Sequence, residues 1–137
     1  MRSSRLRLAV SQARDLGDDG SAVVEFVLVS IIVVVLLLAV LQLGLALHIR
    51  NTLIAAAGEG ARFAAAADRE PPDGVIHTQR LIQQSLPDSY AERVTARYAL
   101  VNGVQTIEVE VIADLPVFGW VGAGDTLRVA GHAMEES

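Results

Sequence analysis

The hydrophobic pattern is dominated by an apolar run from Phe26 to Leu47, which is 22 residues long and has no charged side chain. Seventeen of these residues are Leu, Ile, Val or Phe, and the polar exceptions are Ser30 and Gln42. As an α-helix the run is about 33 Å long, enough to cross the hydrocarbon core of a bilayer. Because lipid offers no hydrogen-bond partners, even β-branched residues are expected to be helical there. The pattern predicts a transmembrane helix over residues 26–47.

The helical pattern continues beyond the apolar run. Residues 48–70 contain no proline and are rich in alanine, the best helix former. Pro71-Pro72 is expected to end this helix, which predicts one long helix over residues 21–70. After a turn at Asp73-Gly74, residues 75–86 are expected to form a short second helix.

A narrow stripe of mostly small residues follows one side of the alanine-rich segment. Ile54, Ala57, Ala61 and Ala64 recur at 3-4-3 spacing, which places them on one helical face. Small residues allow another helix or a sheet to approach closely. The stripe is a packing surface either for the protein's own folded part or for another subunit, and the sequence leaves both open.

Alternating residues around Asn102-Gly103 predict an antiparallel hairpin of residues 93–101 and 104–113. Pairing across this turn places Arg97 opposite Glu108 and Thr95 opposite Glu110 on one polar face. The other face is apolar, and pairs Val94, Ala96 and Tyr98 with Val111, Val109 and Ile107. Residues 126–134 predict a third strand, with Leu127, Val129 and Ala133 pointing inward.

These elements predict an α+β fold, in which a long N-terminal helix packs on a small antiparallel β-sheet. Residues 1–20 form a charged leader that we expect to be unstructured, and residues 71–137 form a small domain of 67 residues. The loop between the second and third strands carries Phe118 and Trp120 in a chain with few aromatic residues. This loop either closes the small core or contacts another subunit or the membrane surface.

The polar residues argue against several classes of function. The net charge of −5, without a Lys-rich or Arg-rich run, disfavours nucleic acid as a partner, and a chain without cysteine has no disulfide or thiolate site. His48, His77 and His132 lack metal-ligand spacing. Glu108 and Glu110 share a strand face, but their expected neighbours explain them without catalysis. We therefore expect no enzymatic activity, no metal or other cofactor and no small-molecule substrate.

Arginine residues indicate the orientation of the membrane helix. Four arginines precede the helix and two, Arg50 and Arg62, follow it closely, which places the N-terminus inside and the C-terminal part outside. A conventional signal peptide is the alternative, since Ala55-Ala56-Ala57 has the A-x-A cleavage pattern. The apolar core of a signal peptide is typically about 7–15 residues, shorter than this run.

The segment Gly20-Ser-Ala-Val-Val-Glu25-Phe26 precedes the apolar run with a lone carboxylate at its boundary. A charged leader that ends in Gly, then four residues, Glu-Phe and a long apolar helix, is the signature of type IV prepilin-like proteins. Together with residues 51–65 (Asn-Thr-Leu-Ile-Ala-Ala-Ala-Gly-Glu-Gly-Ala-Arg-Phe-Ala-Ala), the segment resembles the TadE-like family, pseudopilins of the tight-adherence (Flp) pilus machinery.

The resemblance implies a pilin-like fold and cleavage by a membrane prepilin peptidase between Gly20 and Ser21. It also implies that Glu25 and the adjoining Phe26 serve assembly with other pilin or pseudopilin subunits in the cytoplasmic membrane or in an extracellular pilus. Phe26 rather than Tyr after the glutamate suits the pseudopilin branch. The alternative function is an unprocessed, membrane-anchored binding domain outside the cytoplasm.

Overall fold

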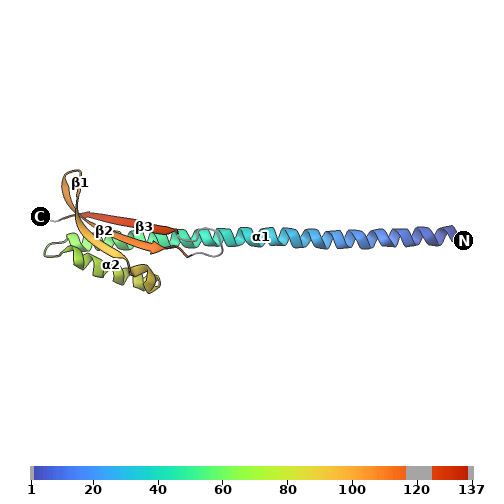
Figure 1. Ribbon diagram of the computed structural model, residues 1–137, viewed down its shortest axis with the longest axis horizontal. Helices are drawn as coiled ribbons and strands as arrows, with labels where there is room; N and C mark the ends of the chain where they lie inside the picture. Colours follow the sequence, from blue (N-terminus) through green and yellow to red (C-terminus); the bar gives the residue numbers. More distant parts are fainter. Residues whose placement is uncertain (1, 117–124, 136–137) are drawn as a thin grey trace. The chain divides into compact units, whose positions relative to one another are not determined.

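The computed structural model describes residues 2–116 and 125–135, with side chains from Gly17 onward. Its elements are α1 (Arg2–Ala65), α2 (Pro71–Ser85), the 3-10 helix η1 (Asp88–Ala91) and strands β1 (Val94–Val101), β2 (Val104–Asp114) and β3 (Thr126–Met134) (Figure 1). The chain divides into an N-terminal unit, Met1–Leu41, and a C-terminal unit, Gln42–Ser137. Helix α1 contributes to both units, and the α+β class is confirmed.

The N-terminal unit is a helix whose apolar side chains face outward all round. From Val23 to Leu41 the large apolar residues are between 48% and 73% exposed. The most apolar stretch of α1 has a mean hydropathy of 3.2 and no buried residues, so by length and composition this helix can span a membrane. These features indicate a single-pass membrane protein.

The leader is helical, because α1 begins at Arg2, and the expectation of an unstructured leader is wrong. Residues 1–20 contain no proline, and their Leu, Ala, Arg and Gln residues have high helix propensity. Nothing in this composition stops a helix before the apolar run begins.

The end of α1 also differs from the sequence prediction. Helix α1 ends at Ala65, and Asp68 adopts the left-handed conformation with φ 66°. Pro71-Pro72 begin α2 instead of ending α1, because proline lacks only an N–H that is unpaired in the first helical turn anyway. Asp73 and Gly74 therefore lie within α2 and not in a turn before it. The Glu70 backbone N–H donates to Asp73 Oδ2 at 2.9 Å, which caps the first turn of this helix.

The sheet has the order β1-β2-β3 and is antiparallel throughout. The predicted hairpin register is confirmed, including the pairing of Arg97 with Glu108 and of Tyr98 with Ile107. Asn102 and Gly103 have φ values of 52° and 80°, as a two-residue type I′ turn requires. Strand β3 has the predicted bounds.

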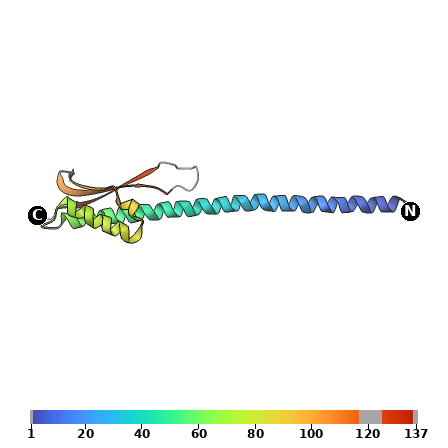
Figure 2. The ribbon, with the colours of Figure 1, turned by 60° about the horizontal axis from the view of Figure 1, so that its bottom comes forward.

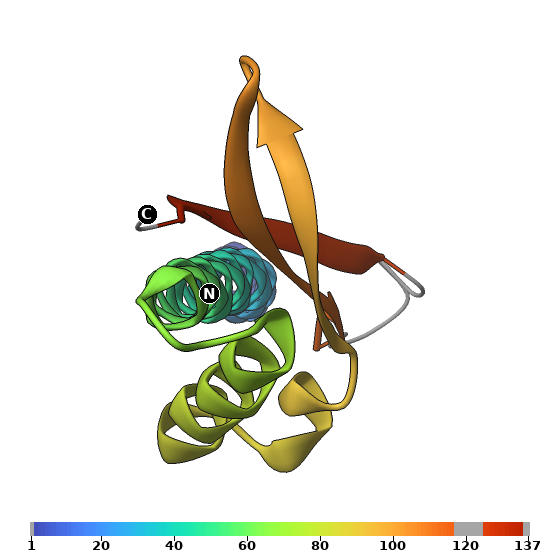
Figure 3. The same ribbon diagram turned by 90° about the vertical axis from the view of Figure 1, so that its left-hand side faces the viewer.

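The core of the C-terminal unit lies between the sheet, the C-terminal part of α1, and α2. Figure 2 shows the sheet and α2 on different sides of this part of α1, and Figure 3 shows the same arrangement end-on. Leu53, Ile82 and Ile107 are fully buried there. The backbones approach closely at glycines: a Cβ atom on Gly60 would lie 2.9 Å from the Gly74 carbonyl oxygen, and one on Gly131 would overlap the backbone of Ala57 and Gly58.

Candidate functional site

The segment from Gly20 to Phe26 lies within the continuous helix α1 and is exposed along its whole length. A side chain added at Gly20 would have no neighbour within 4 Å, and Phe26 is 73% exposed. The Ser30 hydroxyl donates to the Phe26 carbonyl oxygen at 2.7 Å, so this polar residue is satisfied within the helix. The backbone and side chains around the predicted cleavage position are therefore not covered by any described part of the chain.

Glu25 is the one carboxylate at the edge of the apolar run, and it makes no ion pair or hydrogen bond with the described residues. Ser21 lies four residues before it, on the same face of the helix. An unpaired carboxylate at a membrane boundary is costly. A cationic group near Ser21, or one on a neighbouring subunit, would neutralise it.

The small-residue stripe lies against the protein's own C-terminal unit over most of its length. Ala57 and Ala61 are fully buried and Ala64 is 1% exposed. Ala57 lies against the Gly131 backbone of β3, and Ala64 lies against Gly74 of α2. Ile54 is off this face and 41% exposed, whereas Leu53 and Ile49, which the stripe omitted, are buried. The buried face of α1 therefore continues from Ala57 to Leu53, one residue before the predicted Ile54.

Phe118 and Trp120, the predicted contact residues of the β2–β3 loop, lie outside the described residues. Among the described residues on either side, the Leu115 N–H donates to the Asp125 carbonyl oxygen at 3.2 Å. The role of the two aromatic residues stays a prediction.

The polar face of the sheet carries a network that sequence reasoning found only in part. Arg97 Nε donates to Glu108 Oε1 at 2.9 Å, as the register implied, and His132 Nε2 of β3 donates to Glu108 Oε2 at 2.7 Å. The hydrogen bond from His132, aided by the neighbouring Arg97, outweighs desolvation and holds the pKa of Glu108 below its usual value. Arg128 lies 3.3 Å from Glu110, so both paired glutamates have basic partners.

The histidines do not form a metal site in the described part of the chain, where no group of three His, Asp or Glu side chains converges. His132 contacts Glu108, and the His77 ring stacks on Phe63 with a centroid distance of 4.1 Å. The His48 carbonyl oxygen accepts a hydrogen bond from the Thr52 hydroxyl at 2.9 Å. These contacts account for the side chains of His77 and His132, whereas His48 is exposed and only its backbone takes part in the contact.

A protein-family model described as TadE-like protein matches residues 20–62. The resemblance inferred from the sequence is thus confirmed over this segment, which begins at Gly20 and includes Glu25, the apolar run and most of the alanine-rich helix. No curated protein and no solved structure matches the chain. The family match ends within α1, before α2 and the sheet begin.

Proposed function

We propose that this protein is a pseudopilin-type structural subunit of a tight-adherence pilus or of its assembly machinery. A prepilin peptidase cuts it after Gly20, and Glu25 then mediates assembly with other pilin or pseudopilin subunits. The observation that carries the proposal is the coincidence of the family match with an exposed Gly20 and an unpaired Glu25 at the start of an apolar helix.

Cleavage and the role of Glu25 are linked by helix geometry. Cutting between Gly20 and Ser21 creates an α-amine four residues before Glu25, on the same helical face. An ammonium group there, in the same chain or in a neighbour displaced along the helix axis, neutralises the carboxylate. Membrane insertion does not require Glu25, because the apolar run favours insertion by about 5–10 kcal/mol.

Intact-mass measurement of the protein recovered from its native membrane tests the processing step. We expect a mature chain that starts at Ser21, and Gly20→Leu should leave the full-length chain uncleaved. Gly17→Leu is the matched control, since Gly17 is another glycine of the same helix with no neighbour within 4 Å. A mature N-terminus at Gly58 would instead demonstrate conventional signal-peptide cleavage and reject the pseudopilin assignment.

Substitution of Glu25 tests the assembly step. Glu25→Gln should keep the membrane level and leader removal near wild type, while crosslinking to sister subunits or pilus output falls. Glu25→Asp should rescue only partly, because its shorter side chain reaches the amine less well. Glu59→Gln is the control, since it removes an exposed carboxylate that pairs with Arg62 at 2.9 Å. Normal assembly of Glu25→Gln would reduce Glu25 to an interfacial charge and favour an ordinary anchored domain.

The arginine distribution supports an orientation with the N-terminus in the cytoplasm and the C-terminal unit outside. The chain has no cysteine, so one introduced thiol reports one position. Asn102→Cys should react with a membrane-impermeant thiol reagent in intact cells, and Ser4→Cys in an uncleaved Gly20→Leu background should not. The reverse labelling pattern would overturn the orientation.

A further inference from the structure

Exposed apolar side chains gather at the end of the β1–β2 hairpin. We call this surface the hairpin tip; it comprises Tyr98, Leu100, Val101, Val104 and Met134. Leu100 is 76% exposed and Met134 72% exposed. Residues 98–107 also contain no charged side chain, in a chain of which 20% is charged. Such clustering of exposed apolar groups marks an interaction surface.

The tip is exposed because the hairpin continues past the end of the third strand. Met134 pairs with Thr106, while β1 and β2 extend further, to the Asn102-Gly103 turn. By the strand register, Tyr98 and Leu100 lie on one face of this ribbon and Val101 and Val104 on the other. Figure 3 shows the ribbon projecting away from the two helices. No described element of the C-terminal unit covers it.

A second surface on the same unit has complementary chemistry. A cavity of about 280 Å³ beside α2 is lined by Phe63, Ile76 and His77, together with Arg69, Arg80 and Asp73. Ile76 is 57% exposed, and the Arg69 guanidinium lies 3.7 Å from the Phe63 ring centroid. We call this surface the α2 pocket.

The hairpin tip and the α2 pocket carry charges of opposite sign. In the part of the chain that the structure describes, Arg69 and Arg80 have no carboxylate partner, while Asp73 is engaged by the Glu70 N–H. Glu135 adjoins the hairpin tip, where its N–H donates to the Gln105 carbonyl oxygen at 3.4 Å. Its side chain has no cationic partner among the same residues. The hairpin tip thus combines apolar groups with an acidic group, and the α2 pocket combines apolar groups with basic ones.

We propose that the hairpin tip of one copy docks into the α2 pocket of a second copy. The hairpin tip and α2 lie on opposite sides of α1 (Figure 3), so one C-terminal unit cannot make this contact with itself. The contact is head-to-tail and can therefore continue from copy to copy. This docking proposal depends on the proposed function in one respect: several copies must share one membrane.

The charges also favour this occupant over the alternatives. Lipid-inserting segments typically carry basic residues that attract anionic headgroups, whereas the tip adjoins Glu135 and the Arg97 beyond it is paired with Glu108. A tip-to-tip contact would bring two Glu135 carboxylates together. The patch is small compared with stable interfaces, so we expect weak affinity that is supported by confinement in the membrane.

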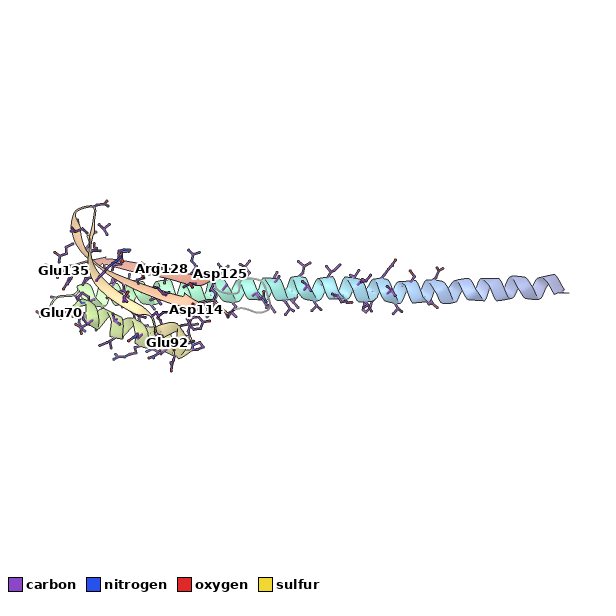
Figure 4. The ribbon with its side chains drawn as sticks, viewed as in Figure 1. Glu70, Glu92, Asp114, Asp125, Arg128 and Glu135 are labelled. Atoms are coloured by element: carbon purple, nitrogen blue, oxygen red, sulfur yellow. The ribbon has the colours of Figure 1, made fainter. Side chains whose placement is uncertain are left out.

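Paired single-cysteine variants of the full-length protein test the contact. Leu100→Cys and Ile76→Cys proteins are placed in the same phosphatidylcholine vesicles and treated with a short bifunctional maleimide. Glu92→Cys is the control partner, because Glu92 is exposed and lies at the opposite end of the unit from Glu135 (Figure 4). We expect crosslinks from Leu100→Cys to Ile76→Cys to exceed those to Glu92→Cys by about tenfold, a preference of about 1.4 kcal/mol.

Three results would overturn the contact: equal yields with the two partners, a dominant crosslink between two Leu100→Cys chains, or protection of Leu100→Cys from a water-soluble thiol reagent by vesicles that hold isolated copies. The last two would assign the tip to a tip-to-tip contact or to lipid. If Glu25→Gln still lowered crosslinking between subunits in the same vesicles, the proposed function would remain intact. Failure of this contact is therefore distinguishable from failure of the assembly role.

A charge exchange gives an independent readout. Arg80→Glu on the Ile76→Cys chain should lower the specific crosslink several-fold, and Glu135→Arg on the Leu100→Cys chain should do the same. Combining the two in trans should restore most of the yield, because the pair is again of opposite sign. Additive losses without recovery would rule out the proposed pairing of these charges.

Discussion

The two parts of α1 use similar apolar residues in opposite ways. In the N-terminal unit Leu36 is 60% exposed, like its apolar neighbours on every side, whereas beyond Leu47 the helix buries Leu53 fully and exposes mainly polar residues such as Arg50, Glu59 and Arg62. An apolar surface on all sides must be surrounded by lipid or by other protein, while a one-sided surface needs a partner on one side only. The difference separates the part of the helix that a membrane stabilises from the part that its own sheet and second helix stabilise.

Matched leucine substitutions in the two parts of α1 should give the largest difference in stability. Leu53→Ala should lower the free energy of unfolding of the C-terminal unit by about 2–5 kcal/mol, because it leaves a cavity in the core. Leu36→Ala leaves no cavity in the protein and should not change that stability. Hydrogen exchange of the β2 amides in the full-length protein in detergent micelles measures both effects. Equal effects of the two substitutions would contradict the division of α1.

Glycine substitutions at the covered and uncovered sides of α1 should change stability by an intermediate amount. Gly131→Ala should destabilise the C-terminal unit by about 1–3 kcal/mol, because its methyl group would overlap the α1 backbone at Ala57. At Gly58 a Cβ atom would meet only Arg62 Nη1, at 3.9 Å, so Gly58→Ala should stabilise the helix by up to about 1 kcal/mol. Thermal unfolding followed by circular dichroism gives the sign of each change. A stabilising Gly131→Ala would show that β3 does not press on α1.

Substitution of Glu108 on the polar face of the sheet should change the free energy of unfolding least, and by an amount that depends on pH. Since the pKa of Glu108 is lowered in the folded protein, its contribution is fully present above the pKa of the unfolded chain. The contribution is lost as pH falls through the lowered folded value. Glu108→Gln should therefore cost less than about 1 kcal/mol at pH 7, because its partner Arg97 is 71% exposed and solvent screens the pair, and the difference from wild type should shrink in acid. Urea unfolding at neutral and acidic pH measures this difference, and a gap that widens in acid would contradict the assigned sign.

The pairing partners of Glu108 show where sequence analysis reached its limit. Its partner Arg97 follows from the hairpin register, because a two-residue turn fixes which residues lie opposite each other. His132 belongs to β3, which joins β2 through a long connection, and the sequence alone did not indicate its register. Local pairing was predictable, and pairing across the long connection was not.

The sequence by itself determined the features that rest on local periodicity and on turn chemistry. These are the apolar run, the Asn102-Gly103 hairpin with its register, the bounds of β3, and the Gly20–Glu25 segment that the family match includes. Each depends on residues close in the chain, or on a solvent preference that every residue of the run shares.

Only the tertiary structure decided which neighbours those elements acquired. It placed Leu53 rather than Ile54 in the core, made Pro71-Pro72 the start of a helix, and set Gly131 against the backbone of Ala57. It also left the hairpin tip uncovered, although the alternating pattern of the strand continues through Leu100. The physical reason is that burial depends on the distance to segments far away in the chain, and a periodic pattern specifies a face without specifying what covers it.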